Sequence, residues 1–431
     1  MLLPHYPVNA ILAVEPRRVQ WQRAQDVRRL ARMAEATPRA GQPTSWSDIP
    51  WDLACQVLRL LPAYADRARF AAVCPQWRAA ARTLPLVAIP DGTFYSLPYG
   101  KPFRFPGFGC AGFKGNFGRW LVFLRHNGCY LVDPFARATV ALPALSHVRL
   151  WPPNAVAKYV DNEDNTHTGN TCCSWMDIIR NQPKMPTLNK MIPCSPNLVA
   201  AFVITGRGGH ILICQPGASS WSVRAYDKCK MFKDMAFYQG KLYALDSNEN
   251  LLIINISQDP STGDPQVSRI GQAIKGDPDH WYRVFFPDKT MYEKKLYLLE
   301  SRGKLLMVRR KIWCKVEDNG KVVALAGQNE FEVFEADLEH SRWVNVTTLG
   351  DDKVIFLGHG CSRAVSASQY GMSGDQIFFL DDIMENVLEY FIDGESTSVG
   401  VYDMRTGEIS SPLPMVWMHE MIHAAWLFPW D

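Results

Sequence analysis

The residues of this sequence that could most directly do chemistry lie near its end. His419, Glu420 and His423 form an H-E-x-x-H motif. On a helix, the two histidines would share one face and could bind zinc, with Glu420 as the general base. On a strand, His419, Met421 and His423 would alternate to one side, which is not a tetrahedral arrangement. The strand-like repeats upstream favour a strand here, so we expect no metal site.

Other patterns that could indicate catalysis are weaker. The glycine-rich stretch TGRGGH at residues 205–210 lacks the Lys-Ser/Thr of a phosphate loop and is typical of a hairpin turn. Asp381 and Asp382 are more typical of a solvated loop than of a paired-carboxylate site. No Ser/His/Asp or Cys/His arrangement can be placed from the spacing. We therefore expect no catalytic residue and no cofactor, in a protein that is not an enzyme.

Composition argues against several classes of partner. The 431 residues are enough for two or three domains, and 47% hydrophobic with 21% charged residues is typical of a globular protein. A net charge of +3 creates no global field that favours nucleic acid or a membrane. The apolar run at residues 10–14 is too short for a signal peptide, and no stretch approaches a membrane span. We expect a soluble protein of the cytoplasm or nucleus that binds neither nucleic acid nor membrane.

The eleven cysteines indicate reduced thiols. They are scattered, and no C-x-x-C pair occurs among them. Cys172 and Cys173 are adjacent, and a disulfide between neighbours would be strained. Most of the others lie in apolar runs, so we expect small buried hydrophobes rather than a disulfide framework.

Residues 1–43 form a basic tail. Within it, residues 15–40 carry seven arginines and three acidic residues. The spacing of Val19, Val27 and Leu30 is loosely helical. This segment fits a basic amphipathic helix, a targeting segment or a frayed tail, and we take the tail as the default.

Residues 44–85 predict three short helices. Pro50 suits the first turn of the first helix because its missing N–H is not needed there. Asp66 can cap the second helix, and Pro75 can start the third. One apolar stripe along the first helix consists of Leu53, Val57, Leu60 and Leu61. So short a segment cannot bury a self-sufficient core, so it either caps the larger domain or presents apolar surface to a partner.

From residue 93 onward the pattern changes to short strands separated by Gly, Pro or Asn-Gly. Two phrases, at residues 232–256 and 287–310, align on Lys-Leu-Tyr, with Tyr243 and Tyr297 placed 54 residues apart. The polar, turn-rich residues 151–192 break this rhythm, and we take them as a long surface insertion.

A second repeat defines the fold class. CYLVDPFARATVALP at residues 129–143 and GVYDMRTGEISSPLP at residues 400–414 share a strand, an Asp, a turn with Arg and a second strand. Such repeats are typical of four-stranded antiparallel units that pack face to face around a ring. Residues 86–431 therefore predict an all-β propeller of six or seven blades, with a two-layer sandwich array as the alternative.

The helical stretch resembles an F-box. That family's Leu-Pro, its spaced aliphatic residues and its Val-Cys-x-x-Trp-Arg ending are matched, and VCPQWRAAA is the most specific part. The resemblance implies that a Skp-type adaptor is bound by Ile49, Pro50, Leu53, Val57, Leu60, Leu61, Val73, Cys74, Trp77 and Arg78. The chain departs from the pattern at Arg67, where the family has Leu after Asp66. This departure bears on adaptor affinity and not on the fold.

The downstream region resembles the KIB-type β-propeller that follows F-boxes in a large plant family. The resembling phrases include FYSLPYGKPFRFP, GRWLVFLRHNGCYLVDPF and KDMAFYQGKLYALD. Together the two resemblances imply a small all-α three-helix F-box at residues 44–85 and an all-β propeller at residues 86–431.

The function implied by these resemblances is that of a substrate-receptor subunit in an SCF-type (Skp–cullin–F-box) E3 ubiquitin ligase. The F-box would dock on the Skp adaptor, and through it on the cullin ligase. The propeller would recruit an unknown target protein for ubiquitination. The alternative is a propeller interaction module that acts outside any ligase and carries a degenerate F-box.

Overall fold

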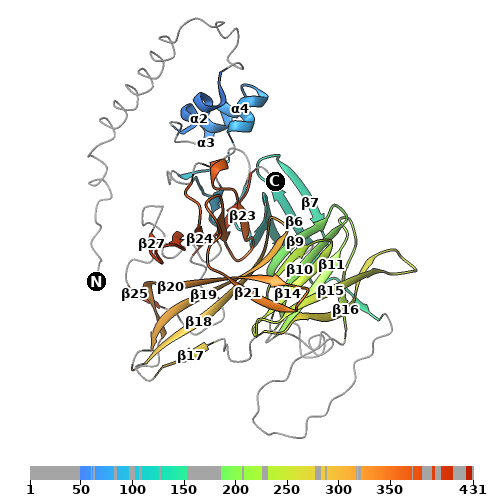
Figure 1. Ribbon diagram of the computed structural model, residues 1–431. Coiled ribbons are helices and arrows are strands. Elements are labelled where there is room, and N and C mark those ends of the chain that lie inside the picture. Colours follow the sequence, from blue (N-terminus) through green and yellow to red (C-terminus); the bar gives the residue numbers. More distant parts are fainter. Residues whose placement is uncertain are drawn as a thin grey trace, which may run out of the picture. The chain divides into compact units, whose positions relative to one another are not determined.

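We analysed a computed structural model of the chain (Figure 1). It divides into two compact units, Met1–Thr83 and Leu84–Asp431, which we describe separately. The residues that the structure describes are 49–59, 61, 64–81, 85–96, 102–105, 109–125, 128–152, 186–205, 208–225, 232–276, 283–286, 289–316, 318, 322–370, 372–380, 391–393, 399–410 and 424–429. The basic tail lies outside these residues.

Three short helices follow one another in the first unit. They are α2 (Trp51–Arg59), α3 (Tyr64–Ala71) and α4 (Pro75–Ala80). The carbonyl of Pro50 accepts the first backbone hydrogen bond of α2, from the Ala54 N–H at 3.1 Å. Asp66 lies inside the first turn of α3 rather than before it, so it is not the cap that the sequence predicted.

A small cluster of side chains holds these helices together. Its buried members are Ala54, Leu58, Phe70, Ala71 and Ala81, and Leu61 and Trp77 pack against them. The rings of Phe70 and Trp77 stack with centroids 4.2 Å apart. Three of the five buried side chains are alanines, so this core buries little apolar area.

The described strands of the second unit form six sheets. Blade 1 has the order β28 (Ala425–Leu427), β1 (Leu86–Ala88), β2 (Phe94–Ser96) and β3 (Pro102–Phe103). Blade 2 contains β4 (Gly115–Phe117), β5 (Trp120–Arg125), β6 (Gly128–Asp133) and β7 (Ala138–Leu142). Blade 3 has the order β9 (Thr187–Ser195), β10 (Leu198–Thr205), β11 (Gly208–Cys214), β12 (Trp221–Arg224) and β8 (Val148–Trp151).

The other three blades follow in chain order (Figure 1). Blade 4 contains β13 (Phe232–Tyr238), β14 (Lys241–Asp246), β15 (Leu251–Gln258) and β16 (Pro265–Ile274). Blade 5 contains β17 (Arg283–Phe285), β18 (Thr290–Ser301), β19 (Lys304–Val316), β20 (Val322–Asp337) and β21 (Arg342–Val346), with β25 (Phe391–Asp393) paired to β20. Blade 6 has the order β23 (Arg363–Val365), β22 (Val354–Leu357), β24 (Gln376–Leu380), β26 (Val399–Asp403) and β27 (Ile409–Ser410), and a short 3₁₀ helix, η2 (Ser368–Tyr370), follows β23.

These sheets form a closed ring of six blades, which confirms the predicted propeller and decides between the six or seven blades expected from the repeats. The inner strands β28, β4, β9, β13, β18 and β23 contact one another in that order. Strand β28 pairs with β1, from Leu86–Leu427 to Ala88–Ala425, and so joins the last strand to the first blade. Five apolar clusters are each shared by two neighbouring blades, which is why the blades stack face to face.

The repeated aspartates sit at equivalent corners. Asp133, Asp337 and Asp403 each end the strand that precedes an outer strand. Their side chains accept hydrogen bonds from backbone N–H groups two or three residues further on. An Asp at this position therefore closes the turn to the outer strand, which explains the strand-Asp-turn-strand pattern.

The structure corrects three details of the sequence interpretation. Tyr243 lies on β14 and Tyr297 on β18, so the two Lys-Leu-Tyr phrases are not equivalent. The equivalent positions are the two-residue turns Gln239–Gly240 and Arg302–Gly303, which both have positive φ angles. The strand β9 begins at Thr187, inside the predicted 151–192 insertion, and residues 153–185 lie outside the described part. Parallel pairs also occur, between β8 and β12 and between β22 and β24.

Candidate functional site

Helix α2 carries apolar side chains on two faces. Ala54 and Leu58, four residues apart, are buried in the helical core. Leu53 and Val57, also four residues apart, are 37% and 40% exposed. An ordinary surface helix has a single apolar stripe. The second stripe on α2 is therefore available for contact with something outside the helical core.

Further apolar residues with exposed surface lie just before α2 and between α3 and α4. Pro50, just before α2, is exposed, and Ile49 beside it is half-buried. Val73, between α3 and α4, is 51% exposed. In the described part of the chain, the exposed large apolar residues are Leu53, Val57, Val73, Phe286 and Val344. Three of these five belong to the short helical unit, so exposed apolar surface is concentrated there.

Other residues predicted at this surface have internal roles. Trp77 is half-buried through its stacking on Phe70. The Cys74 Sγ accepts a hydrogen bond from the Trp77 N–H at 3.4 Å and so caps α4. The Arg78 Nε donates to the Ala71 carbonyl at 3.4 Å, although the side chain is exposed. Leu61 packs on the core, and Leu60 lies outside the described residues.

Arg67, the departure from the F-box pattern, points inward. The residue is 8% exposed, and its Nε donates to the Leu61 carbonyl at 3.0 Å. A charged side chain at this position therefore does not project into the solvent-facing surface beside Leu53 and Val57.

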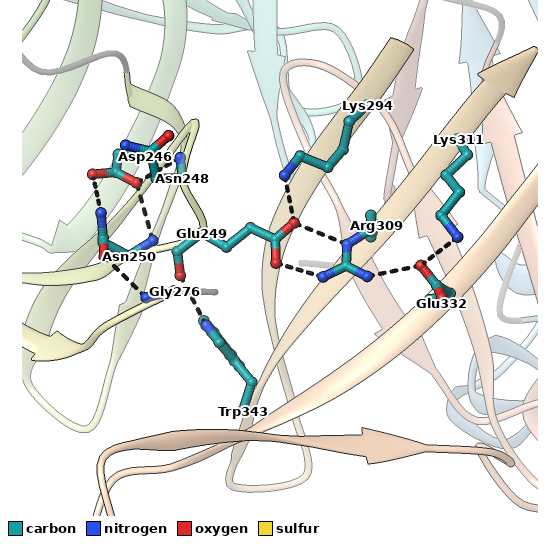
Figure 2. A network of polar contacts seen from close by, with 10 residues as sticks. All are labelled: Asp246, Asn248, Glu249, Asn250, Gly276, Lys294, Arg309, Lys311, Glu332 and Trp343. Atoms are coloured by element: carbon teal, nitrogen blue, oxygen red, sulfur yellow. Dashed lines mark hydrogen bonds and ion pairs between the residues drawn. The ribbon is translucent and has the colours of Figure 1, made fainter. Parts of the chain in front are cut away.

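Sequence reasoning missed a buried charge network between blades 4 and 5. Figure 2 shows Glu249, in the turn between β14 and β15, reaching Lys294 on β18 and Arg309 on β19. The Lys294 Nζ lies 2.7 Å from Glu249 Oε1, and the Arg309 Nη2 lies 2.5 Å from Oε2. Each of these three side chains is at most 4% exposed. The pairs join two neighbouring blades through full charges.

The same network continues along blade 5 toward solvent. The Arg309 Nη1 also contacts Glu332 at 2.9 Å, and the Lys311 Nζ contacts Glu332 at 3.2 Å (Figure 2). The indole N–H of Trp343 donates to the Glu249 carbonyl at 2.9 Å, so β21 is attached as well. Acids and bases alternate along the network, so charges of opposite sign join blades 4 and 5.

The electrostatics of Glu249 fit this structural role. Burial alone would raise the pKa of Glu249, but the hydrogen bonds from Arg309 and Lys294 outweigh burial and lower it. Burial lowers the pKa of Lys294, and Glu249 opposes that shift. Glu249 therefore remains a carboxylate whose charge is balanced inside the protein.

A second buried ion pair ties three inner strands together. The Lys190 Nζ on β9 lies 2.5 Å from Asp234 Oδ1 on β13, and both side chains are about 5% exposed or less. Asp234 also accepts hydrogen bonds from the backbone N–H groups of Met235 and Leu298. Blades 3, 4 and 5 therefore meet at one carboxylate.

Blade 5 also carries an aromatic cluster at the surface. The rings of Phe286, Tyr292 and Trp313 lie within 5.4–6.2 Å of one another, and Phe286 is 38% exposed. The Lys311 Nζ lies 5.8 Å from the Tyr292 ring centroid, and the Trp313 indole donates to Glu330 at 3.0 Å. Aromatic side chains with fixed positions are frequent anchors of protein interfaces.

The structure bears on the remaining sequence predictions, those about metal binding, only within the described residues. The described residues contain no group of three or more His, Cys, Asp or Glu side chains that could hold a metal ion. The motif at His419–His423 and the pair Asp381–Asp382 lie outside those residues.

The seven described cysteines with a recorded state are free, and burial raises the pKa of the Cys194 thiol to about 12. Among the described helices, none is both long and apolar enough to cross a membrane.

Comparison with known proteins identifies both units. The sequence model of the KIB1-4 β-propeller matches residues 87–403, and that of the F-box domain matches residues 46–88. The chain is 24% identical over 399 residues to F-box protein SKIP23 of Arabidopsis thaliana, covering 84% of this chain and 90% of that protein. It is 21% identical to F-box protein At2g26160 of the same plant, covering 80% and 97%.

A solved structure adds no support to this assignment. The extracellular domain of a one component system from B. thetaiotaomicron aligns over 76% of this chain and 58% of its own, with 9% identity and a TM-score of only 0.23. The assignment rests on the sequence matches and on the ring of blades with its helical unit. The chain belongs to the KIB1-4 β-propeller family and carries an F-box domain in front of the propeller.

Proposed function

We propose that this protein is a substrate-receptor subunit of an SCF-type E3 ubiquitin ligase. In this role the F-box docks on a Skp-type adaptor, which links it to a cullin, and the propeller recruits a target protein for ubiquitination. The observation that carries the proposal is the second apolar stripe of α2, formed by Leu53 and Val57, which the helical core leaves exposed. Membership of an F-box family of plant proteins supports the same role.

The energetics require several residues to act together. Leu53 and Val57 are already more than half covered, so their full burial contributes roughly 0.5–1 kcal/mol each. Pro50, just before α2, and Val73, between α3 and α4, add further exposed apolar area. Association itself costs several kcal/mol in lost freedom. A stable dock therefore needs this whole surface, together with complementary groups on the adaptor.

A binding measurement with a purified Skp-type adaptor tests the docking step. The double variant Pro50→Ala/Leu53→Ala should lose most of the affinity of the wild-type chain. Val344→Ala is the matched control, because Val344 is 41% exposed but lies on blade 5. Equal binding by the wild type and the double variant would refute the proposed role, and so would an equal loss in the control.

The aromatic cluster of blade 5 is our candidate for the target-binding surface. It combines exposed ring area at Phe286 with ring positions fixed by mutual packing. Proximity labelling with the wild-type full-length chain and with its Phe286→Ala/Trp313→Ala variant tests this assignment. We expect specific labelled proteins to disappear from the variant while adaptor binding is unchanged. Identical labelling by both proteins would place the target surface elsewhere.

The proposed role is one of placement and not of catalysis. In this role the protein holds the target in place, and other subunits of the ligase carry out the ubiquitin transfer. We further propose that the protein acts in the cytoplasm or nucleus, which agrees with the free state of its described cysteines. Fractionation of cells that express the tagged chain tests this location. The reason to consider a degenerate F-box was Arg67, and its inward position weakens that alternative.

A further inference from the structure

Arg67 joins the second F-box helix to the end of the first. Its Nε donates to the carbonyl of Leu61 at 3.0 Å, two residues beyond the end of α2. The last turn of α2 is closed there by the hydrogen bond from the Leu61 N–H to the Leu58 carbonyl at 3.1 Å. Carbonyls at the C-terminal end of a helix carry partial negative charge and favour a cation. Arg67 therefore supplies both a donor and a charge at this link.

The described core of the helical unit is small. Among its described residues, Ala54, Ala71 and Ala81 contribute little area, and Leu58 and Phe70 are the large buried members. The exposed apolar residues sit on different pieces of this unit, Leu53 and Val57 on α2 and Val73 between α3 and α4. A rigid partner can cover them together only when the position and orientation of α3 relative to α2 are fixed.

We propose that Arg67 is a positioning residue that pre-sets the adaptor-docking surface by clamping α3 to the end of α2. This inference rests on the proposed function, because it assigns Arg67 to the same docking step. The residue acts from inside the helical unit and makes its contribution before the adaptor binds. The chain thus uses an internal hydrogen bond where the family pattern uses an apolar side chain.

The substitution Arg67→Met tests the clamp because it keeps an unbranched stem and removes the donor. We expect about tenfold weaker adaptor binding in isothermal titration, the effect of losing one hydrogen bond made by a charged group. The number of sites should stay unchanged, and the heat-capacity change should become more negative because binding must then also order the link. Arg67→Lys should restore part of the affinity.

Arg69→Met is the matched control. Arg69 lies two residues away on the same helix, and its side chain is 80% exposed in a surface pair with Asp66. This variant should bind the adaptor as the wild type does. Affinity within twofold of wild type for Arg67→Met would overturn the proposal. A loss shared equally by Arg69→Met, or one that appears only as fewer binding sites, would also overturn it.

Hydrogen exchange separates failure of the clamp from failure of the proposed function. In the free full-length chain, the amides of residues 57–61 should exchange faster in Arg67→Met than in Arg69→Met. If the wild type does not bind the adaptor, the proposed function fails, yet this difference still measures the clamp. Equal exchange in the two variants would show that Arg67 does not restrain the link, and the inference would then be wrong.

Discussion

The helical unit and the propeller distribute their apolar side chains differently. In the helical unit, α2 buries Ala54 and Leu58 but leaves Leu53 and Val57 exposed. In the propeller, five apolar clusters are each shared by two neighbouring blades, so one blade covers the open face of the next. The propeller satisfies its apolar faces within the chain, whereas the F-box retains a face that another protein can cover.

The two units also differ in how they use buried charge. Glu249, Lys294 and Arg309 form a compact internal network that joins two blades. In the helical unit, Arg67 is paired with a backbone carbonyl at a helix end. Buried charges in the propeller therefore connect neighbouring blades. In the F-box, the buried Arg67 connects two short helices. Three experiments examine this contrast, beginning with the largest expected effect.

Glu249→Gln should produce the largest loss of stability. The substitution leaves Lys294 and Arg309 buried without a compensating carboxylate at Glu249, which typically costs about 3–5 kcal/mol. Denaturant unfolding, followed by residue-resolved hydrogen exchange in the propeller, measures the change. Glu335→Gln is the control, because its partner Lys304 is 54% exposed and the pair is worth about 1 kcal/mol or less. Equal losses in the two variants would contradict a structural role for the network.

The same leucine-to-alanine change should have opposite consequences in the two units. Leu245, on β14, is fully buried, and its truncation should cost about 2–5 kcal/mol of unfolding free energy. Leu53 is 37% exposed, so its truncation should cost less than about 1 kcal/mol but should weaken adaptor binding. Unfolding and adaptor-binding measurements on both variants check the pair. A large stability loss in Leu53→Ala would mean that its outward face is part of the fold.

The effect that should be smallest at neutral pH is a dependence of the propeller's stability on pH. Burial lowers the pKa of His210, on β11, from 6.5 to about 4. Between these values the unfolded chain binds a proton that the folded chain does not, so stability falls as the pH drops from about 6.5 to about 4. The slope should approach about 1.4 kcal/mol per pH unit. His210→Gln should flatten this part of the profile, and an unchanged slope would assign it to other groups.

The helical unit was predictable in outline because its signals are local. The spacing of Leu53 and Val57 and the prolines at 50 and 75 follow from helix geometry. The inward role of Cys74 and Trp77 could not be read in this way, since capping and stacking depend on how α4 packs. Arg67 was interpreted as a weakness because a sequence pattern does not show which side chains turn inward.

The propeller was predictable as a class, but its details depend on long-range pairing. The aspartate turns correctly indicated the repeat. The two Lys-Leu-Tyr phrases instead aligned β14 with β18, which are not equivalent strands. Glu249 lies in a polar turn, and its sequence context indicates a solvent-exposed side chain. A signal was nevertheless present, because Lys294 and Arg309 lie on strands beside apolar segments, where a buried charge requires a partner. The blade count depended on β28, whose partner β1 is distant in sequence.

The pairing of β28 with β1 has a consequence for the way the chain is made. During translation β1 emerges before every other described strand, and β28 emerges after all of them. The space taken by Trp426, whose indole is fully buried and bonds to the Leu357 carbonyl at 2.8 Å, stays vacant until then. A chain truncated before β28 would therefore lack both the strand that pairs with β1 and the side chain that fills this space.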